Sequence, residues 1–115
     1  MTAQTIEILA LAIAEVNLAF VPGSEAFIYR NPGKLHSGEN LRKFTTWAGG
    51  LKSLISELIR YKEKELVLAV ATNYGCSTVE KEFVVLDYLS RGLGKEVTKE
   101  STLYNLEYEE GNENA

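Results

Sequence analysis

The 115-residue chain has one cysteine, Cys76, and one histidine, His36. A single cysteine cannot form a disulfide within the chain, and one cysteine with one histidine cannot make up the ligand set of a zinc site. No EF-hand spacing of acidic residues is present. Neither Gly33-Lys34 nor Gly94-Lys95 has the spacing of a phosphate-binding P-loop. We therefore expect no metal site and no cofactor.

Long uncharged hydrophobic runs are also absent. The most apolar stretch, residues 6–20, is interrupted by Glu7, Glu15 and Asn17 and is too short to cross a bilayer. No basic segment precedes it, as a secretory signal would require. The 12 Lys+Arg are outnumbered by 16 Asp+Glu, and the net charge of −4 argues against a general nucleic-acid binder. We expect a chain that binds neither nucleic acid nor membrane, located in the cytoplasm or in a particle assembled there.

Apolar sequence is sufficient for one compact domain. Apolar residues make up 45% of the chain and charged residues 24%, which are ordinary shares for a globular protein. No internal repeat or domain boundary is visible, so we expect a single domain over residues 1–106. Residues 107–115 are acidic and polar and are expected to form a frayed tail.

Hydrophobic periodicity predicts a mainly α fold. A helix from about Gln4 that ends before Pro22 brings five apolar side chains onto one stripe. These are Ile6, Leu9, Ile13, Val16 and Phe20. A second helix is expected over residues 46–62, with Thr45 or Thr46 as its N-cap and Trp47 on its apolar stripe.

The second half of the chain predicts further helices. Ser77 and Glu80 fit a capping box, and the helix that follows is expected to run to about Arg91. Its apolar side is expected to hold Val79, Phe83, Leu86 and Leu89–Ser90. A last short helix is expected over residues 98–106. Residues 66–73 are an apolar run that fits a buried strand and a short buried helix equally well.

Residues 22–45 have the composition of a loop-rich lobe. Turn signals lie at residues 31–33 and 38–40, and a short strand is expected over residues 26–30. A short β-hairpin fits this part of the chain. A polar connection as long as residues 22–45 is unusual in a compact domain and indicates a functional role.

Several motifs occur in a recognisable order. Phe20-Val21-Pro22-Gly23-Ser24 follows the first helix, and Arg30-Asn31-Pro32-Gly33-Lys34-Leu35 comes next. Gly38-Glu39-Asn40-Leu41-Arg42-Lys43-Phe44 then precedes Trp47-Ala48-Gly49-Gly50-Leu51, and a Leu-Gly turn ends at Gly94. Over roughly residues 5–105 this order resembles the small phage-type lysozyme-like proteins, which are related to lytic transglycosylases. The resemblance implies a small lysozyme-like helical domain with its loop-rich lobe at residues 22–45.

The family's catalytic position has changed in this chain. Members end the first helix in a pattern like Ala-Glu-Gly-Phe-x-x-Pro-Gly-Ser, whose glutamate is the expected general acid. Counting back from Pro22, that position is Asn17, and the glycine after it is Leu18. An amide cannot donate a proton as a carboxylic acid does. The resemblance therefore implies a degenerate member, in which Asn17, Tyr29, Arg30 and Asn31 are candidate binding residues of the old sugar groove.

Three glutamates are candidates for a rearranged catalytic site. Glu15 lies about 160° from Asn17 on a helical wheel, on the polar side of the first helix. Glu25 and Glu39 flank the loop-rich lobe, and paired carboxylates can carry out glycoside hydrolysis. Solvated surface charges are the alternative interpretation of all three.

Three functions fit the sequence. The favoured hypothesis is a degenerate lysozyme-like protein that acts by binding a phage structural or host protein, with peptidoglycan or an oligosaccharide as a further ligand. The second is an active peptidoglycan-cleaving enzyme that uses Glu15, Glu25 or Glu39. The third is a small acidic inhibitor of a host protein, because its negative charge suits a basic protein surface.

Overall fold

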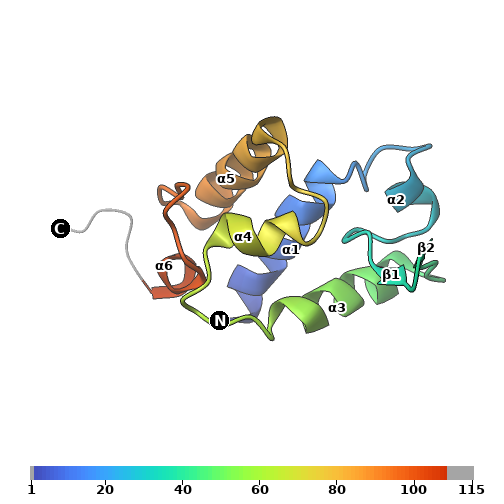
Figure 1. Cartoon of the computed structure of the whole chain (residues 1–115), viewed down its shortest axis with the longest axis horizontal. Coiled ribbons are helices and arrows are strands. Elements are labelled where there is room, and N and C mark those ends of the chain that lie inside the picture. Colours follow the sequence, from blue (N-terminus) through green and yellow to red (C-terminus); the bar gives the residue numbers. More distant parts are fainter. Residues whose placement is uncertain (1, 109–115) are drawn as a thin grey trace.

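A computed structural model describes residues 2–108 of the chain (Figure 1). The prediction of a mainly α fold with a short hairpin inside residues 22–45 is confirmed. Within residues 2–108 no helix is long and apolar enough to cross a membrane. The elements are α1 (Ala3–Val16), α2 (Glu25–Ile28), β1 (His36–Ser37), β2 (Asn40–Leu41), α3 (Trp47–Leu58), α4 (Val67–Thr72), α5 (Val79–Leu93) and α6 (Leu103–Tyr108).

Helix α1 lies at the centre of the fold and packs against both α5 and α3 (Figure 1). Its N-cap, Thr2, accepts a hydrogen bond from the backbone N–H of Thr5. The predicted apolar stripe is buried as far as Val16, and Leu9 and Ile13 are fully buried. This stripe meets Leu54 and Leu58 of α3 and Leu89 of α5 in one hydrophobic core. α1 is thus the element from which both halves of the molecule are positioned.

The loop-rich lobe consists of α2 and the hairpin, at one end of the molecule (Figure 1). His36 pairs with Leu41 and Ser37 with Asn40 in antiparallel register. The turn between them contains Gly38, whose φ is 65°. A small second core of Ala14, Ala19 and Ala26, with the half-buried Trp47 against it, joins the lobe to α1 and α3. The lobe is fixed to the helical body by this second core and by Leu35, which is buried in the main hydrophobic core.

Two expectations about the start of the chain are wrong. The strand expected over residues 26–30 is the helix α2, whose N-cap Ser24 accepts a hydrogen bond from the backbone N–H of Phe27. Phe20 does not belong to the core stripe, because α1 ends at Val16 and the chain turns away; its side chain is 47% exposed.

The other helices follow the predictions with shifted boundaries. Of the two predicted N-cap residues, Thr45 and Thr46, it is Thr46 that caps α3. The helix ends at Leu58, before the predicted end at residue 62. Residues 67–72 form a helix, so the apolar run at residues 66–73 is a short buried helix and not a strand. The last helix begins at Leu103 and includes Glu107 and Tyr108, the first residues of the expected tail. Residues 109–115 lie outside the described residues.

The apolar side expected for α5 is confirmed at Leu89, which is buried, and at Leu86, which packs against the core, but it is wrong at Val79 and Phe83. Its N-cap is Thr78, one residue after the predicted Ser77, and accepts from the backbone N–H of Lys81. Val85 and Leu89 are buried against α1, whereas Val79 and Phe83 are 78% and 69% exposed. The apolar side chains of α5 therefore lie on two faces, and only one of them faces the core.

Candidate functional site

The position that the resemblance assigns to a catalytic glutamate is the C-cap of α1, Asn17. Its side chain is buried, with 4% of its surface exposed. The Asn17 Nδ2 group donates to the backbone carbonyl oxygens of Pro32, at 2.8 Å, and of Tyr74, at 2.9 Å. These two bonds join the end of α1 to the lobe and to the connection between α4 and α5. Both N–H groups of the amide are used to hold the fold.

The other atom of the same amide, Asn17 Oδ1, faces Gly75. It accepts no hydrogen bond from residues 2–108. A Cβ atom at position 75 would lie 2.6 Å from this oxygen, and Gly75 has a φ of +90°. Glycine is therefore required at position 75 for two reasons, the close approach of Asn17 and the left-handed backbone.

Backbone strain is concentrated next to Asn17 and in the lobe. Leu18, Arg30 and Lys34 have φ values of 61°, 54° and 51°, and they are the non-glycine residues with positive φ in the described part of the chain. A left-handed conformation costs an L-residue roughly 1–2 kcal/mol. Position 18 is also where the resemblance places a glycine, so its backbone has the conformation that a glycine favours.

Leu18→Gly is expected to stabilise the protein by about 0.5–1 kcal/mol, because relief of the left-handed strain exceeds the entropy that glycine adds to the unfolded chain. The free energy of unfolding from urea titration measures the change. Leu18→Ala is the matched control, since it removes the same half-exposed side chain but keeps the strain. A Leu18→Gly protein less stable than Leu18→Ala would contradict the expectation.

Asn31, a candidate binding residue, lies inside the lobe. It is fully buried. Its Nδ2 donates to the carbonyl oxygens of Leu35 and Arg42, both at 2.9 Å, and its Oδ1 accepts from the backbone N–H of Leu35 at 2.9 Å. These bonds hold together the two chain segments that lead into and out of the hairpin. The neighbouring candidate, Arg30, is exposed.

The lobe contains a polar hollow of about 830 Å³ that brings several candidates together. Glu25 of α2 and Glu39 of the hairpin turn both line it, and so does Tyr29. The ammonium of Lys43 lies 5.0 Å from the centroid of the Tyr29 ring, in a cation–π contact. The remaining lining residues are Lys34, His36, Asn40, Leu41 and Lys43 itself. We call this cavity the lobe hollow.

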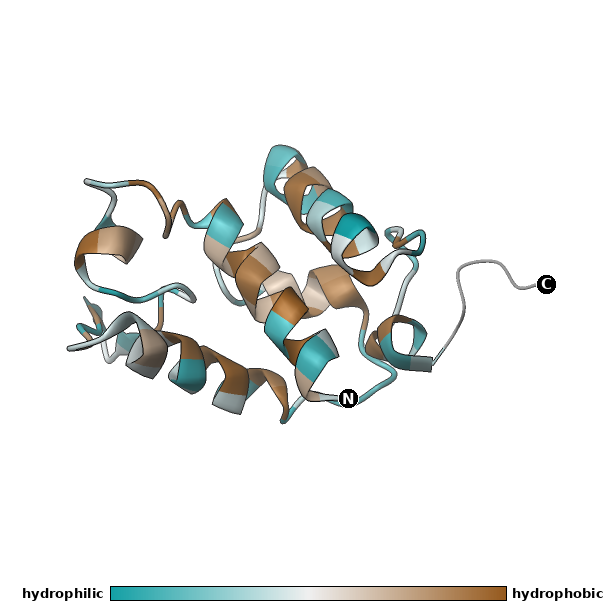
Figure 2. Ribbon diagram, turned by 180° about the vertical axis from the view of Figure 1, so that it is seen from behind, coloured by the Kyte–Doolittle hydropathy of each residue, from teal (hydrophilic) through white to brown (hydrophobic). Residues whose placement is uncertain are grey.

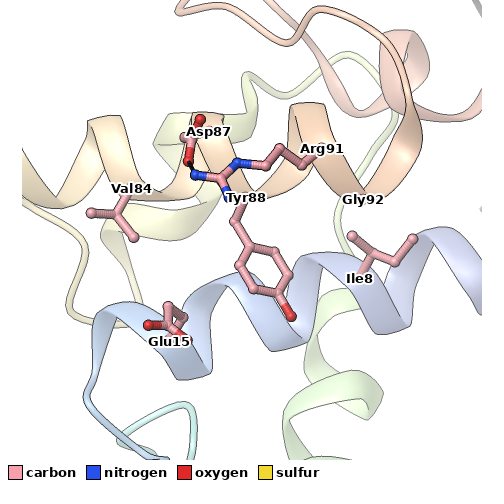
Figure 3. Close-up of a pocket in the computed structure, with 7 residues that line it drawn as sticks. All are labelled: Ile8, Glu15, Val84, Asp87, Tyr88, Arg91 and Gly92. Carbon is pink, nitrogen blue, oxygen red and sulfur yellow. Dashed lines mark hydrogen bonds and ion pairs between the residues drawn. The ribbon is translucent and has the colours of Figure 1, made fainter.

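Glu15 lies apart from that hollow, in a groove of about 630 Å³ between α1 and α5 (Figure 3). Figure 3 shows Tyr88 reaching from α5 toward α1, with Ile8 and Glu15 of α1 on either side of its ring. Asp87 and Arg91 form an i,i+4 ion pair on the α5 side. The remaining lining residues are Val84 and Gly92. Glu15 is exposed, whereas Asn17 is buried. We call this cavity the α1/α5 groove.

A tyrosine network near Asn17 gave no signal in the sequence. The Tyr74 hydroxyl donates to Glu57 Oε1 at 3.0 Å and lies 3.2 Å from the Tyr61 hydroxyl, which accepts from Asn73 Nδ2 at 3.1 Å. Burial, together with the hydrogen bonds to Tyr61 and Glu57, raises the pKa of Tyr74 above its ordinary value. The phenol stays protonated and fixes the segment whose carbonyl oxygen accepts from Asn17.

Cys76 is not an activated nucleophile. It is fully buried, and burial raises the pKa of its thiol to about 11, although the positive charge of Lys81 opposes the shift. The thiol is therefore protonated at neutral pH and unreactive. Cys76 is a small buried side chain of the hydrophobic core.

The chain also exposes a run of large apolar side chains between α1 and the end of α2. Their exposed fractions lie between 44% and 57%. Figure 2 shows brown, hydrophobic ribbon along this loop and on α2. We call this set the lobe surface: Leu18, Phe20, Val21, Phe27 and Ile28. The sequence did not indicate it, because Phe20 fitted the stripe of the first helix.

No protein-family model, curated protein sequence or solved structure matches this chain. The resemblance to lysozyme-like proteins therefore stays a hypothesis. It depends on the order of the motifs and is consistent with the left-handed backbone at Leu18.

Proposed function

We propose that this chain is a catalytically degenerate lysozyme-like protein of phage or prophage origin that acts by binding another protein. One observation carries the proposal. At the position of the family's general acid stands Asn17, a buried amide that donates both of its N–H groups to backbone carbonyl oxygens. Such a group can neither protonate a glycosidic oxygen nor reach a substrate without opening the fold.

The lobe surface supports binding as the retained activity. Isolated exposed apolar side chains are normal, but here five large ones are exposed within residues 18–28, and grouped apolar exposure is typical of interaction sites. Phe20 and Phe27 belong to the residue class that anchors protein interfaces. The Phe20 ring also packs against Trp47, with the ring centroids 5.3 Å apart, so this part of the surface is preorganised.

A turbidity assay on a peptidoglycan suspension tests the loss of catalysis. We expect the wild-type protein to leave the suspension unchanged. The Asn17→Glu/Leu18→Gly variant, run beside it, restores the family's residues at the acid position and at the strained position after it. If only this variant clears the suspension, the chain has also kept a groove that binds the substrate. Clearing by the wild type would overturn the proposal.

A second candidate function comes from the lobe hollow. Glu25 and Glu39 line the same cavity as Tyr29, and carboxylates beside an aromatic ring are suited to a saccharide. In this case the protein would be an active peptidoglycan-cleaving enzyme. The turbidity assay tests this candidate function as well. It requires that the wild type clears the suspension and that Glu25→Gln or Glu39→Gln abolishes the clearing. The Glu15→Gln variant is the control, because Glu15 lies in the α1/α5 groove instead.

A further inference from the structure

The charges of the chain are divided between the lobe and the body. Residues 18–46 contain four basic side chains, Arg30, Lys34, Arg42 and Lys43, and two acidic ones, Glu25 and Glu39. The lobe therefore carries a charge of +2. Because the whole chain carries −4, the remainder carries −6, of which Glu109, Glu110 and Glu113 contribute three charges outside the described residues and the described body contributes −3. The lobe surface thus lies on a locally basic part of an acidic protein.

The α1/α5 groove has complementary properties. Its walls include the apolar side chains of Ile8 and Val84 and the ring of Tyr88. Glu15 and Asp87 bring two negative charges to it and Arg91 brings one positive charge, so its lining is acidic overall. Its volume of about 630 Å³ lies within the range of roughly 300–1,000 Å³ that is typical of occupied clefts.

We propose that the lobe surface of one copy of this chain docks into the α1/α5 groove of a second copy. The contact joins an apolar projection on a basic lobe to an apolar groove on an acidic body, so burial and charge favour the same pairing. Contact between two lobe surfaces would instead bring two basic lobes together. The inference deepens the proposed function, on which it rests, by naming the protein partner.

The backbone at Leu18 supports an interaction role for the lobe surface. Leu18 keeps a φ of 61° while 54% of its surface is exposed. The left-handed turn therefore holds a large apolar side chain at the surface, where core packing does not repay the strain. Strain of this kind clusters at binding and switch regions, where it presents a group to a partner.

Sedimentation velocity over a roughly hundredfold range of micromolar protein concentration measures the association. We expect it to be weak, because the lobe surface has five apolar side chains and a standard interface involves about 20–30 residues on each side. The wild-type sedimentation coefficient should rise with concentration and fall again at high salt. Phe27→Ser on the lobe surface and Val84→Arg in the groove should each lower the association constant at least about tenfold. Ile59→Ser is the matched control, because Ile59, the C-cap of α3, is 58% exposed and lies outside both surfaces.

Mixing the two variants tests the pairing itself. Phe27→Ser keeps an intact groove and Val84→Arg keeps an intact lobe surface, so an equimolar mixture should form a heterodimer although each variant alone stays monomeric. Both substituted side chains are partly exposed, 44% for Phe27 and 37% for Val84, and unchanged melting temperatures would show that both variants fold.

Several outcomes would overturn the contact. They are a wild type that is monomeric at every concentration, a Val84→Arg variant that associates like the wild type, or a mixture that forms no heterodimer. Co-sedimentation of a monomeric wild type with vesicles of anionic phospholipid would assign the lobe surface to a lipid and also overturn it. Peptidoglycan clearing is a separate readout, so failure of the contact and failure of the proposed function are distinguishable.

Discussion

Replacing Asn17 by aspartate is expected to lower the free energy of unfolding by about 3–5 kcal/mol at pH 7, the usual cost of an unpaired buried charge. The substitution exchanges the amide nitrogen, which donates to Pro32 and Tyr74, for an oxygen that faces the same two carbonyl oxygens. The new carboxylate would also lie at the C-terminal end of α1, where the helix dipole disfavours negative charge. Each of these effects acts against the ionised form.

The loss of stability in Asn17→Asp should depend on pH in a defined direction. Burial, the two carbonyl oxygens and the helix dipole all raise the pKa of the introduced carboxyl group in the folded state above its unfolded value of about 3.9. A raised folded-state pKa means that the neutral acid favours folding. The variant should therefore come closest to the wild type below about pH 4 and lose stability progressively as the pH rises through the folded-state pKa.

Urea titrations at several pH values from about 3.5 to 8 measure this dependence as the difference between variant and wild type. Asn40→Asp is the matched control, because it makes the same chemical change on the exposed hairpin. Its difference from the wild type should stay small at every pH. A difference for Asn17→Asp that is equally small at pH 7 would show that the amide does not hold α1 to the lobe.

Local patterns predicted those features of the fold that depend on neighbouring residues. The wheel of the first helix placed Asn17 on the buried side and Glu15 on the exposed side, because Glu15 lies in α1 and Asn17 is the residue that caps its end. Thr46 caps α3 with its own side chain, and Gly38 takes the left-handed turn of the hairpin. Each of these outcomes is decided within a few residues of the chain.

Features that depend on distant contacts could not be predicted in this way. Segment 25–28 is helical because Ser24 caps it and Ala26 packs against Ala14 and Ala19, although its sequence also fitted a strand. In α5 two apolar stripes compete, and the position of α1 selects Val85 for burial over Val79. Tertiary packing overrode the local preference in both cases.

The candidate site also combines contacts between neighbouring segments with contacts between residues far apart in the sequence. Its first contact joins Asn17 to Pro32, 15 residues away in the loop-rich lobe. Its second acceptor is Tyr74, 57 residues away along the chain, and no sequence signal linked the two. Glu25 and Glu39 line one hollow because the fold brings α2 and the hairpin to the same end of the molecule (Figure 1). Pairing of this kind follows from the fold and not from the spacing of the residues.

Gly50→Ala is expected to be the other strongly destabilising substitution, with a loss of at least about 3 kcal/mol. Helix α3 approaches the lobe so closely at Gly50 that an added Cβ atom would meet the backbone carbonyl oxygen of Arg30. It would also lie 3.0 Å from Cδ of Pro32. No side-chain rotation relieves a clash with a backbone atom, so α3 and the lobe would have to separate. The gain of about 1 kcal/mol in helix propensity from glycine to alanine is too small to offset this.

Gly49→Ala provides the control within the same helix. A Cβ atom at Gly49 meets only the Thr46 side-chain oxygen, at 3.1 Å, so its effect should stay within about 1 kcal/mol. Thermal unfolding separates the two variants, since each kcal/mol shifts the melting temperature of a domain of this size by roughly 4 °C or more. Equal melting temperatures would mean that α3 and the lobe tolerate separation. Because Pro32 also accepts from Asn17, Gly50→Ala should weaken that bond, and faster hydrogen exchange at the end of α1 would report it.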